Sequence, residues 1–95
     1  MCIQFRTHYE WDEAKRHENL RKYGVDFADA VGVFYDDYAI TRPDPDSVGE
    51  NRMVTLGMGL NLRVLCVVWV ECHGETYRII SAREASPGEI RQYQE

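Results

Sequence analysis

Residues 63–83 read RVLCVVWVECHGETYRIISAR, and this segment sets the architecture of the chain. It holds two apolar runs, Val64–Val70 and Tyr77–Ile80, and both are rich in the β-branched and aromatic residues typical of strands. The segment therefore predicts a β-hairpin. Because the first run is apolar at every position, including Val68, we expect its strand to be buried on both faces. It should pair with strands at Arg52–Met58 and Thr76–Ser81.

The flanking sequence predicts helices and further strands around this hairpin. Asp12 is placed to cap a helix over residues 13–22, and Asp26 is placed to cap a second helix with apolar residues at helical spacing. Residues 86–89, Ser-Pro-Gly-Glu, form a capping-box pattern that starts a short last helix.

Two more segments have the character of strands. Residues 38–42 predict a strand, and residues 2–5 alternate weakly, as a short edge strand would. Residues 52–58 alternate as a half-buried strand should, with Val54, Leu56 and Met58 on one face. The predicted class is α+β, with a largely antiparallel four-stranded sheet, two N-terminal helices and a short C-terminal helix.

The composition is that of one small globular domain. The 95 residues are 44% hydrophobic and 28% charged. No apolar run approaches the roughly 20 residues of a membrane span, and residues 1–9 lack the apolar core of a signal peptide. We therefore expect a single domain over residues 1–95, located in the cytoplasm and without membrane contact.

The three cysteines have no paired spacing, which is typical of a reducing compartment. Cys66 lies inside the apolar run and should belong to the core. Cys72-His73 has no second pair of ligands nearby, so it is a weak indication of a metal site. We predict neither a metal nor another cofactor.

The formal net charge of −5 is concentrated in one segment. Residues 36–51 hold five acids and one base, a net of −4, so the other residues together carry only −1. A basic surface elsewhere is therefore compatible with the acidic total. The acidic segment itself predicts a contact with a basic partner.

Lysines and arginines supply the candidate binding groups. Lys15, Asn19 and Lys22 share one face of the first predicted helix, opposite Ala14, His17 and Leu20. The simplest interpretation of the lysine face is a solvated stripe, because exposed lysines are common.

Three arginines, Arg52, Arg78 and Arg83, lie near strand ends, where their forked donors would suit phosphate oxygens. Pairing with acids such as Glu50, Glu71 or Glu84 is an equally good interpretation. Arg78 and Arg83 are five residues apart and would face opposite sides of a regular strand. Their convergence therefore requires the strand to bulge or end near Ser81.

Residues spread over nearly the whole chain also carry a resemblance to a known family. They are Trp11-Asp12, Lys15, Asn19-Leu20, Lys22, Gly24-Val25, Phe27, Ala30, Val33-Phe34, Glu50, Arg52, Gly57 and Arg78-Ile79-Ile80-Ser81-Ala82-Arg83. This series resembles the BrnT toxin family of type II toxin–antitoxin systems. The resemblance implies a RelE-like fold and a ribonuclease that cleaves RNA and inhibits translation. It also implies a BrnA-like antitoxin with a ribbon-helix-helix part, through which the toxin would meet DNA only indirectly.

A ribonuclease without a metal must deprotonate a ribose 2′-hydroxyl, stabilise charge on the reacting phosphate and protonate the leaving 5′-oxygen. Arginines suit the second task, whereas the acid and the base stay open among Glu50, Tyr23, His17 and His73. The candidate catalytic residues are Arg78, Arg83, Glu50 and Tyr23, and the candidate RNA-binding residues are Lys15, Lys22 and Arg52.

The chain departs from the family pattern at two positions. Tyr23 stands where relatives commonly have histidine, and Glu13 stands where they often have proline. A phenol is a poor base at neutral pH, so a proton-transfer role at position 23 is weakened. The alternative to a ribonuclease is therefore a binding protein of the same fold that pairs with the antitoxin and has little or no activity. A small-ligand domain is the third possibility, and the sequence supports it least.

Overall fold

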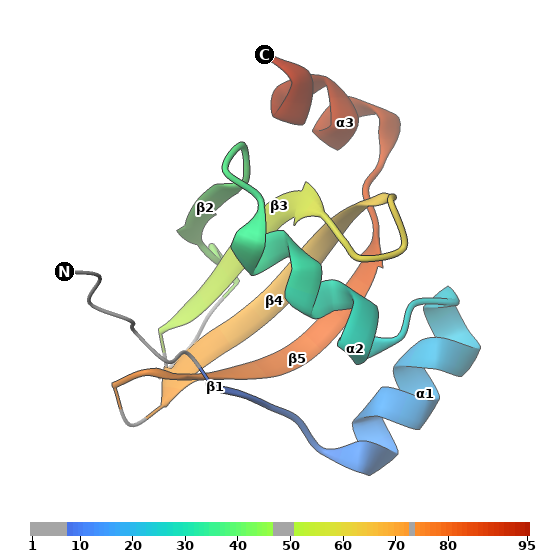
Figure 1. The fold of residues 1–95 in the computed structure, drawn as a ribbon, viewed down its shortest axis with the longest axis vertical. Helices are drawn as coiled ribbons and strands as arrows, with labels where there is room; N and C mark the ends of the chain where they lie inside the picture. Colours follow the sequence, from blue (N-terminus) through green and yellow to red (C-terminus); the bar gives the residue numbers. More distant parts are fainter. Residues whose placement is uncertain (1–7, 47–50, 73) are drawn as a thin grey trace, which may run out of the picture.

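The computed structural model describes residues 8–46, 51–72 and 74–95. The elements are β1 (His8–Glu10), α1 (Glu13–Tyr23), α2 (Phe27–Ala30), the 3-10 helix η1 (Val31–Tyr35), β2 (Ile40–Pro43), β3 (Arg52–Met58), β4 (Val64–Cys72), β5 (Thr76–Glu84) and α3 (Pro87–Gln94). In Figure 1, α2 and η1 cross one face of the sheet, whereas α1 and α3 flank the sheet at separate places. None of the helices in the described ranges has the length and apolarity that crossing a membrane requires.

The described residues form one five-stranded sheet in the order β1-β5-β4-β3-β2. β4 lies at its centre and pairs antiparallel with β3 and β5, which confirms the predicted hairpin and its central strand. The predicted four-stranded antiparallel sheet is wrong in detail, because β1 adds a fifth strand that runs parallel to β5. β1 has only three residues, too few to show a strand periodicity. The edge strand expected at residues 2–5 lies outside the described residues.

The first helix has nearly the predicted bounds. The Asp12 carboxylate accepts hydrogen bonds from the N–H groups of Ala14 and Lys15, and Gly24 ends the helix in the left-handed region at φ 71°. α3 begins with the predicted capping box between Ser86 and Glu89.

The second predicted helix is a single α-helical turn that continues as the 3-10 helix η1. The Asp29 carbonyl accepts a hydrogen bond of 2.9 Å from the Leu60 N–H, which belongs to the β3–β4 loop. Gly32 lies against the same loop, where a Cβ atom would be 2.5 Å from the Leu60 nitrogen. The Asp29 carbonyl therefore binds the β3–β4 loop at the point where the α-helical turn ends and the 3-10 helix begins.

β2 begins two residues later than predicted because Asp36 holds the preceding residues in a turn. The Asp36 carboxylate accepts the Tyr38 N–H at 3.0 Å, and the Asp36 carbonyl accepts the Ala39 N–H at 3.1 Å. β3 has the predicted bounds but is not half-buried, since Thr55, Leu56 and Gly57 are consecutive buried residues. The strand is therefore covered on both faces at its centre.

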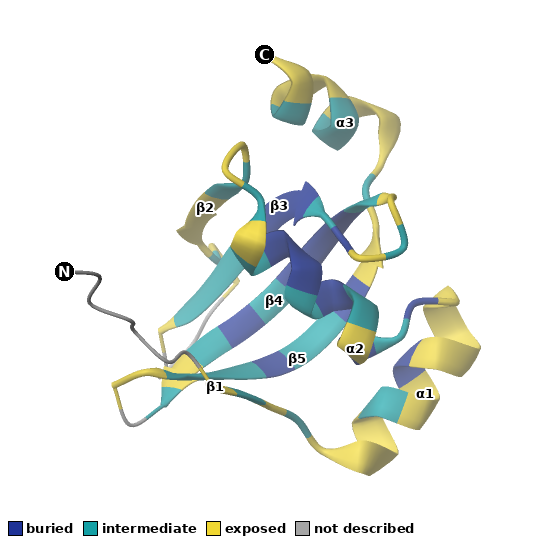
Figure 2. Ribbon diagram, viewed as in Figure 1, coloured by how far each residue is buried: buried dark blue, intermediate teal, exposed yellow. Residues whose placement is uncertain are grey.

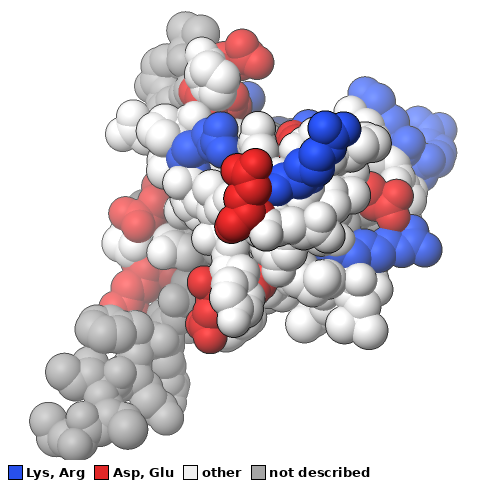
Figure 3. All heavy atoms as spheres, turned by 90° about the horizontal axis from the view of Figure 1, so that it is seen from above, with Lys and Arg blue, Asp and Glu red and all other residues white. Residues whose placement is uncertain are grey.

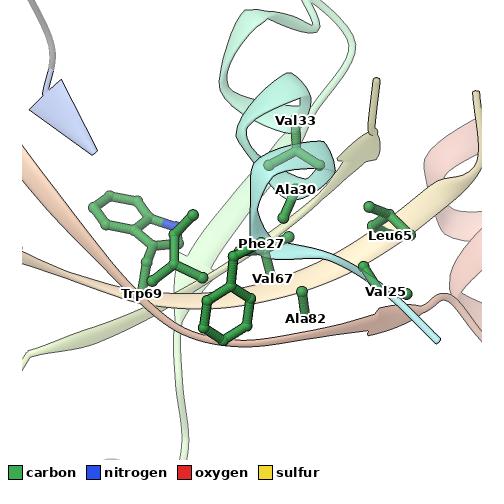
Figure 4. Close-up of a cluster of buried hydrophobic side chains, with 9 residues drawn as sticks. Val25, Phe27, Ala30, Val33, Leu65, Val67, Trp69 and Ala82 are labelled. Atoms are coloured by element: carbon green, nitrogen blue, oxygen red, sulfur yellow. The ribbon is translucent and has the colours of Figure 1, made fainter. Parts of the chain in front are cut away.

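The core lies between the helices and one face of the sheet (Figure 4). Phe27, Ala30 and Val33 come from α2 and η1, and they pack on side chains of β4 and β5 that include Val67 and Ile79. All five are at most 1% exposed, and Figure 2 shows this layer as the buried band of the ribbon. Burial of each large apolar side chain contributes about 1.5–3 kcal/mol, so this layer is the main source of stability.

The other side of the sheet, called the far face here, carries the alternate residues of β3, β4 and β5. Cys66, Val68 and Val70 point to the far face, because side chains alternate along a strand and Val67 points to the core. Cys66 is buried, as expected, whereas Val68 and Val70 are only half-buried. The expectation that every residue of this run is fully buried is therefore wrong for the far-face positions.

A bulge in β5 decides which of its residues reach the far face. Val68 pairs with Ser81 and Trp69 pairs with Ile79, so Ile80 has no partner on β4. Residues paired across a sheet share a face, and the partners of Val70, Val68 and Cys66 are Arg78, Ser81 and Arg83. The two arginines thus lie on the same face of β5, and the bulge that this requires is present beside Ser81.

Candidate functional site

Two hollows adjoin on either side of Ser81. The first, called the helix groove here, has a volume of about 390 Å³ and lies between α1 and β5, with Lys15, Lys22 and Tyr23 in its lining. The second, called the far-face pocket here, has a volume of about 430 Å³ and includes Arg83. Ser81 lines both hollows. The bulged part of β5 therefore lies between the two hollows, and Ser81 borders both of them.

The lysine face of α1 is turned toward β5 through Asn19, whereas its two lysines are exposed, as expected of a solvated stripe. Asn19, in the middle of this face, is 6% exposed and is the only buried residue of the helix. Leu20 on the opposite side is 43% exposed. Lys15 and Lys22 remain exposed at the groove, because long lysine side chains keep their charged ends in water.

Asn19 connects α1 to β5 through its side-chain amide. Its Nδ2 donates to the Ala82 carbonyl at 2.7 Å and to the Val25 carbonyl at 2.9 Å. Its Oδ1 accepts a hydrogen bond from the Ala82 N–H at 3.1 Å. The Nδ2 and Oδ1 atoms of this buried amide therefore both have hydrogen-bond partners, as buried polar groups require.

Tyr23, at the end of α1, lies at the groove with 43% of its surface exposed. The Lys22 ammonium is 5.2 Å from the centroid of the Tyr23 ring, a cation–π distance. The Arg83 pKa is raised, first by its hydrogen bonds to Glu89 and to a smaller extent by Tyr23. Tyr23 and Arg83 line different hollows, which meet at Ser81.

Arg83 forms a two-pronged ion pair with Glu89 of α3, at 2.8 and 3.0 Å. The hydrogen bonds from Arg83 lower the pKa of Glu89 to about 2, against the opposing effect of burial. The pair is only partly shielded, since the side chains are 44% and 26% exposed. A charged ligand can therefore approach Arg83 from solvent.

Arg78 lies on the far face but not in either hollow. Arg78 pairs with Val70 of β4, whereas Arg83 pairs with Cys66. These two positions are four residues, or roughly 13 Å, apart along β4. Arg78 contacts the Glu10 carboxylate at 3.5 Å. Arg52 is level with the same Val70 on the other side of β4, so Arg52 and Arg78 flank one end of the far face.

Acids pair with Arg78 and Arg83, but they are not the ones that the sequence suggested. Glu89 pairs with Arg83 and Glu10 pairs with Arg78, whereas Glu84 pairs with Arg63. The capping-box spacing did predict that Glu89 faces the start of α3, and that carboxylate also accepts the Ser86 N–H.

Some candidates take no part in the described site. His17 is exposed on α1 and lines neither hollow. Glu50 and His73 lie outside the described residues. Conversely, the far-face pocket includes Arg42, Asp44 and Asp46 of the acidic segment, which were not predicted as site residues. Their place in the pocket depends on the pairing of β2 with β3, which a linear pattern does not give.

The surface charges are unevenly distributed. In Figure 3, most lysine and arginine side chains on the visible face lie on the right, the side on which Figure 1 shows α1. Most acidic side chains on that face lie on the left and in the centre. Within the described ranges, no three His, Cys, Asp or Glu side chains are grouped so that they could hold a metal ion.

Comparisons with known proteins give the family. Residues 11–89 match the family described as "Ribonuclease toxin, BrnT, of type II toxin-antitoxin system". The fold is similar to the crystal structure of the Brucella abortus ribonuclease toxin BrnT, with a TM-score of 0.67 and 29% sequence identity over 85% of this chain and 99% of that chain. Curated proteins gave no match. Because the family match spans most of its length, the chain belongs to the BrnT family of ribonuclease toxins of type II toxin–antitoxin systems.

Proposed function

We propose that this protein is an endoribonuclease that cleaves single-stranded RNA without a metal ion and so inhibits translation. The observation that carries the proposal is the junction of the two hollows at Ser81. The helix groove offers Lys15 and Lys22, and the far-face pocket offers Arg83. Cations on both sides of one short strand segment suit an RNA backbone that crosses it.

In the proposed reaction, the scissile phosphate lies at Ser81. The ribose 2′-oxygen loses its proton to a base and attacks the adjacent phosphorus. The bond from phosphorus to the 5′-oxygen then breaks, the 5′-oxygen receives a proton, and the products are a 2′,3′-cyclic phosphate and a 5′-hydroxyl. Arg83 would donate hydrogen bonds to the phosphate oxygens as negative charge accumulates on them.

The two proton-transfer roles are proposed for Tyr23 and Glu50. Tyr23 is the candidate that lines the helix groove, and a phenol is better suited to donating a proton or hydrogen bond than to accepting one at neutral pH. We therefore assign Tyr23 to the leaving oxygen and leave the base to Glu50. Arg52 and Arg78, at the other end of the far face, would bind phosphates further along the RNA.

Glu89 has a direct consequence for substrate binding. Since its carboxylate occupies two donors of Arg83, an RNA phosphate must share or replace this carboxylate. Both Arg78 and Arg83 already contact carboxylates, and these ion pairs favour the second candidate function, a weakly active binding protein.

The partner is proposed to be a BrnA-like ribbon-helix-helix antitoxin. A type II system pairs a toxin with a protein antitoxin, and the family match places this chain on the toxin side. The acidic segment would attract a basic antitoxin surface. Its described part, residues 36–46, includes the exposed Asp37 and Asp46.

Arginine substitutions test the proposed chemistry. We expect Arg83→Ala to lower the RNA cleavage rate about 10²-fold to 10³-fold, because a donor to the transition state is lost. Arg63→Ala is the matched control, since Arg63 also pairs with a glutamate but lies in neither hollow. Equal rates for the parent and a folded Arg83→Ala variant would support the weakly active binding protein instead.

A further inference from the structure

The attachment of α1 to the sheet depends on one polar side chain. Asn19 is the only buried residue of α1, and its amide makes the three hydrogen bonds to Ala82 and Val25 described above. A helix normally packs through an apolar stripe. In α1 that stripe is missing, as the exposure of Leu20 illustrates. The direct attachment of α1 to β5 therefore rests on the Asn19 hydrogen bonds, whereas Arg16 ties the helix to Asp26 at the start of α2.

The Asn19 side-chain amide binds backbone groups of β5 that a neighbouring strand would otherwise bind. β5 pairs with β4 along its whole length, but on its other edge β1 pairs only with residues 76–78. Beyond the bulge at Ile80, the N–H and carbonyl of Ala82 point toward α1 and both bind Asn19. A side-chain amide has the same donor and acceptor as a peptide group, so it can satisfy both. Asn19 thus holds the irregular end of β5 extended.

Ala82 lies directly between the two β5 residues that face the far-face pocket. Ser81 precedes it and Arg83 follows it, and both are placed by the backbone that Asn19 binds. On the helix side, Lys22 and Tyr23 follow Asn19 by three and four residues and lie within one turn of it. One side chain therefore links the two halves of the junction at Ser81.

We propose that Asn19 is a positioning residue for RNA cleavage, which acts by fixing Arg83 and Ser81 relative to Tyr23 and Lys22. This inference rests on the proposed ribonuclease function. Asn19 does not touch the substrate in this proposal. Its contribution comes from geometry, since a displacement of about 1 Å in a reacting group can lower a rate about 10²-fold.

The first experiment is a double-mutant cycle on single-turnover cleavage at saturating RNA. Asn19→Leu keeps the approximate volume but removes all three hydrogen bonds, and we expect it to lower the rate at least about tenfold. If Asn19 acts through Arg83, then Arg83→Ala should lower the cleavage rate by a much smaller factor in the Asn19→Leu background than in the parent. Fully additive losses, or a folded Asn19→Leu variant that cleaves at the parental rate, would overturn the proposal.

A stability control separates positioning from simple destabilisation. Val33→Ala removes buried volume from η1, far along the chain from the junction, and lowers stability by another route. At a temperature where both variants are fully folded, Val33→Ala should cleave at nearly the parental rate. Asn19→Ser, which keeps one hydrogen-bonding group, replaces Asn19→Leu if the latter does not fold, with the same expectation of non-additivity.

A second readout needs no RNA. The NMR signals of the Arg83 Nη–H groups, which donate to Glu89, report on this ion pair and on the position of the side chain. We expect these signals to shift in Asn19→Leu and to stay in place in Val33→Ala. Unchanged signals in folded Asn19→Leu would overturn the proposal. If the parent cleaves no RNA, the ribonuclease function fails, while this measurement still decides whether Asn19 positions Arg83.

Discussion

Tyr23 is the candidate proton-transfer residue at which the chain departs from the pattern that the family resemblance implies. The residue lines the helix groove, next to the junction at Ser81. A phenol stands where the family resemblance implies a histidine, and an imidazole exchanges protons more readily near neutral pH. We therefore expect Tyr23 to be a weak proton-transfer group.

Restoring the histidine should raise the activity. We expect Tyr23→His to increase the cleavage rate at pH 7, because an imidazole at this place can both accept and donate a proton. Initial rates on a fixed RNA would measure the gain. Tyr35→His is the matched control, since Tyr35 is 70% exposed and lines neither hollow. No gain, or an equal gain in the control, would assign proton transfer to another group.

Individual side chains also show where sequence patterns fail. Lys15 and Lys22 could be selected from their helical spacing and Tyr23 from the family resemblance, and all three line one groove. The role of Asn19 could not, because its burial depends on hydrogen bonds to Ala82, 63 residues away in the chain. Hydrophobic periodicity carries no signal for a polar contact of that kind.

Among the elements, α3 is held to the body mainly by polar contacts. It has no buried residue. Arg83 binds Glu89, Arg42 donates to Gln92 at 3.3 Å, and the Tyr93 hydroxyl donates to Asp36. The hydrogen bond to Asp36 raises the pKa of Tyr93 to about 12. The helix should therefore be more sensitive to pH than the apolar core.

We expect acid to loosen α3 before the core unfolds. Folding lowers the pKa of Glu89 from its ordinary 4.5 to about 2, so this pair stabilises the fold fully above pH 4.5. That contribution is lost as the pH falls from about 4.5 to about 2. Melting temperatures measured across this range should fall less steeply for Glu89→Gln than for the parent. Glu84→Gln, from the exposed pair with Arg63, should follow the parent, and identical slopes for all three would contradict the assignment.

β4 gives a prediction that distinguishes its two faces. Val67 is fully buried against the helices, whereas Val68 is half-buried in the far-face pocket. We expect Val67→Asp to prevent folding, because it buries an unpaired charge. Val68→Asp should fold, with reduced RNA cleavage from the added negative charge. Circular dichroism and thermal melts would measure the folding of both variants. A folded Val67→Asp variant beside an unfolded Val68→Asp variant would show that the two faces of β4 are assigned the wrong way round.

Long elements were predicted well and short ones poorly, for a physical reason. The run Val64–Val70 identified the central strand, and the Ser86–Glu89 capping box gave the start of α3. β1 is only three residues long and forms through its parallel pairing with β5, so its own sequence is uninformative. The bulge beside Ser81 could be anticipated from the odd spacing of Arg78 and Arg83, but whether it forms depends on the pairing of β5 with β4.

The charges suggest that RNA binding centres on the lysine groove and antitoxin binding on the acidic segment. The two surfaces meet at the far-face pocket, which Asp44, Asp46 and Arg83 all line. The groove beside α1 carries lysines, whereas residues 36–46 carry four of the acids. We expect reversal of Asp44 and Asp46 to lysine to slow association with the antitoxin at low salt, because long-range attraction is lost. Reversal of Glu71 and Glu75, which changes the net charge equally at the β4–β5 turn, should have less effect. Equal association rates for the two double variants would show that the acidic segment does not guide binding.

The ribonuclease assignment is tested by a single cleavage assay on purified protein. We predict that single-stranded RNA is cut in the presence of a metal chelator and that DNA of the same sequence stays intact, since DNA lacks the attacking 2′-hydroxyl. The 5′ fragments should end in cyclic phosphate. If RNA alone is not cut, the same assay is repeated with translating ribosomes. Cleavage that stops when chelator is added, cleavage of DNA as well, or no cleavage under either condition would contradict the account.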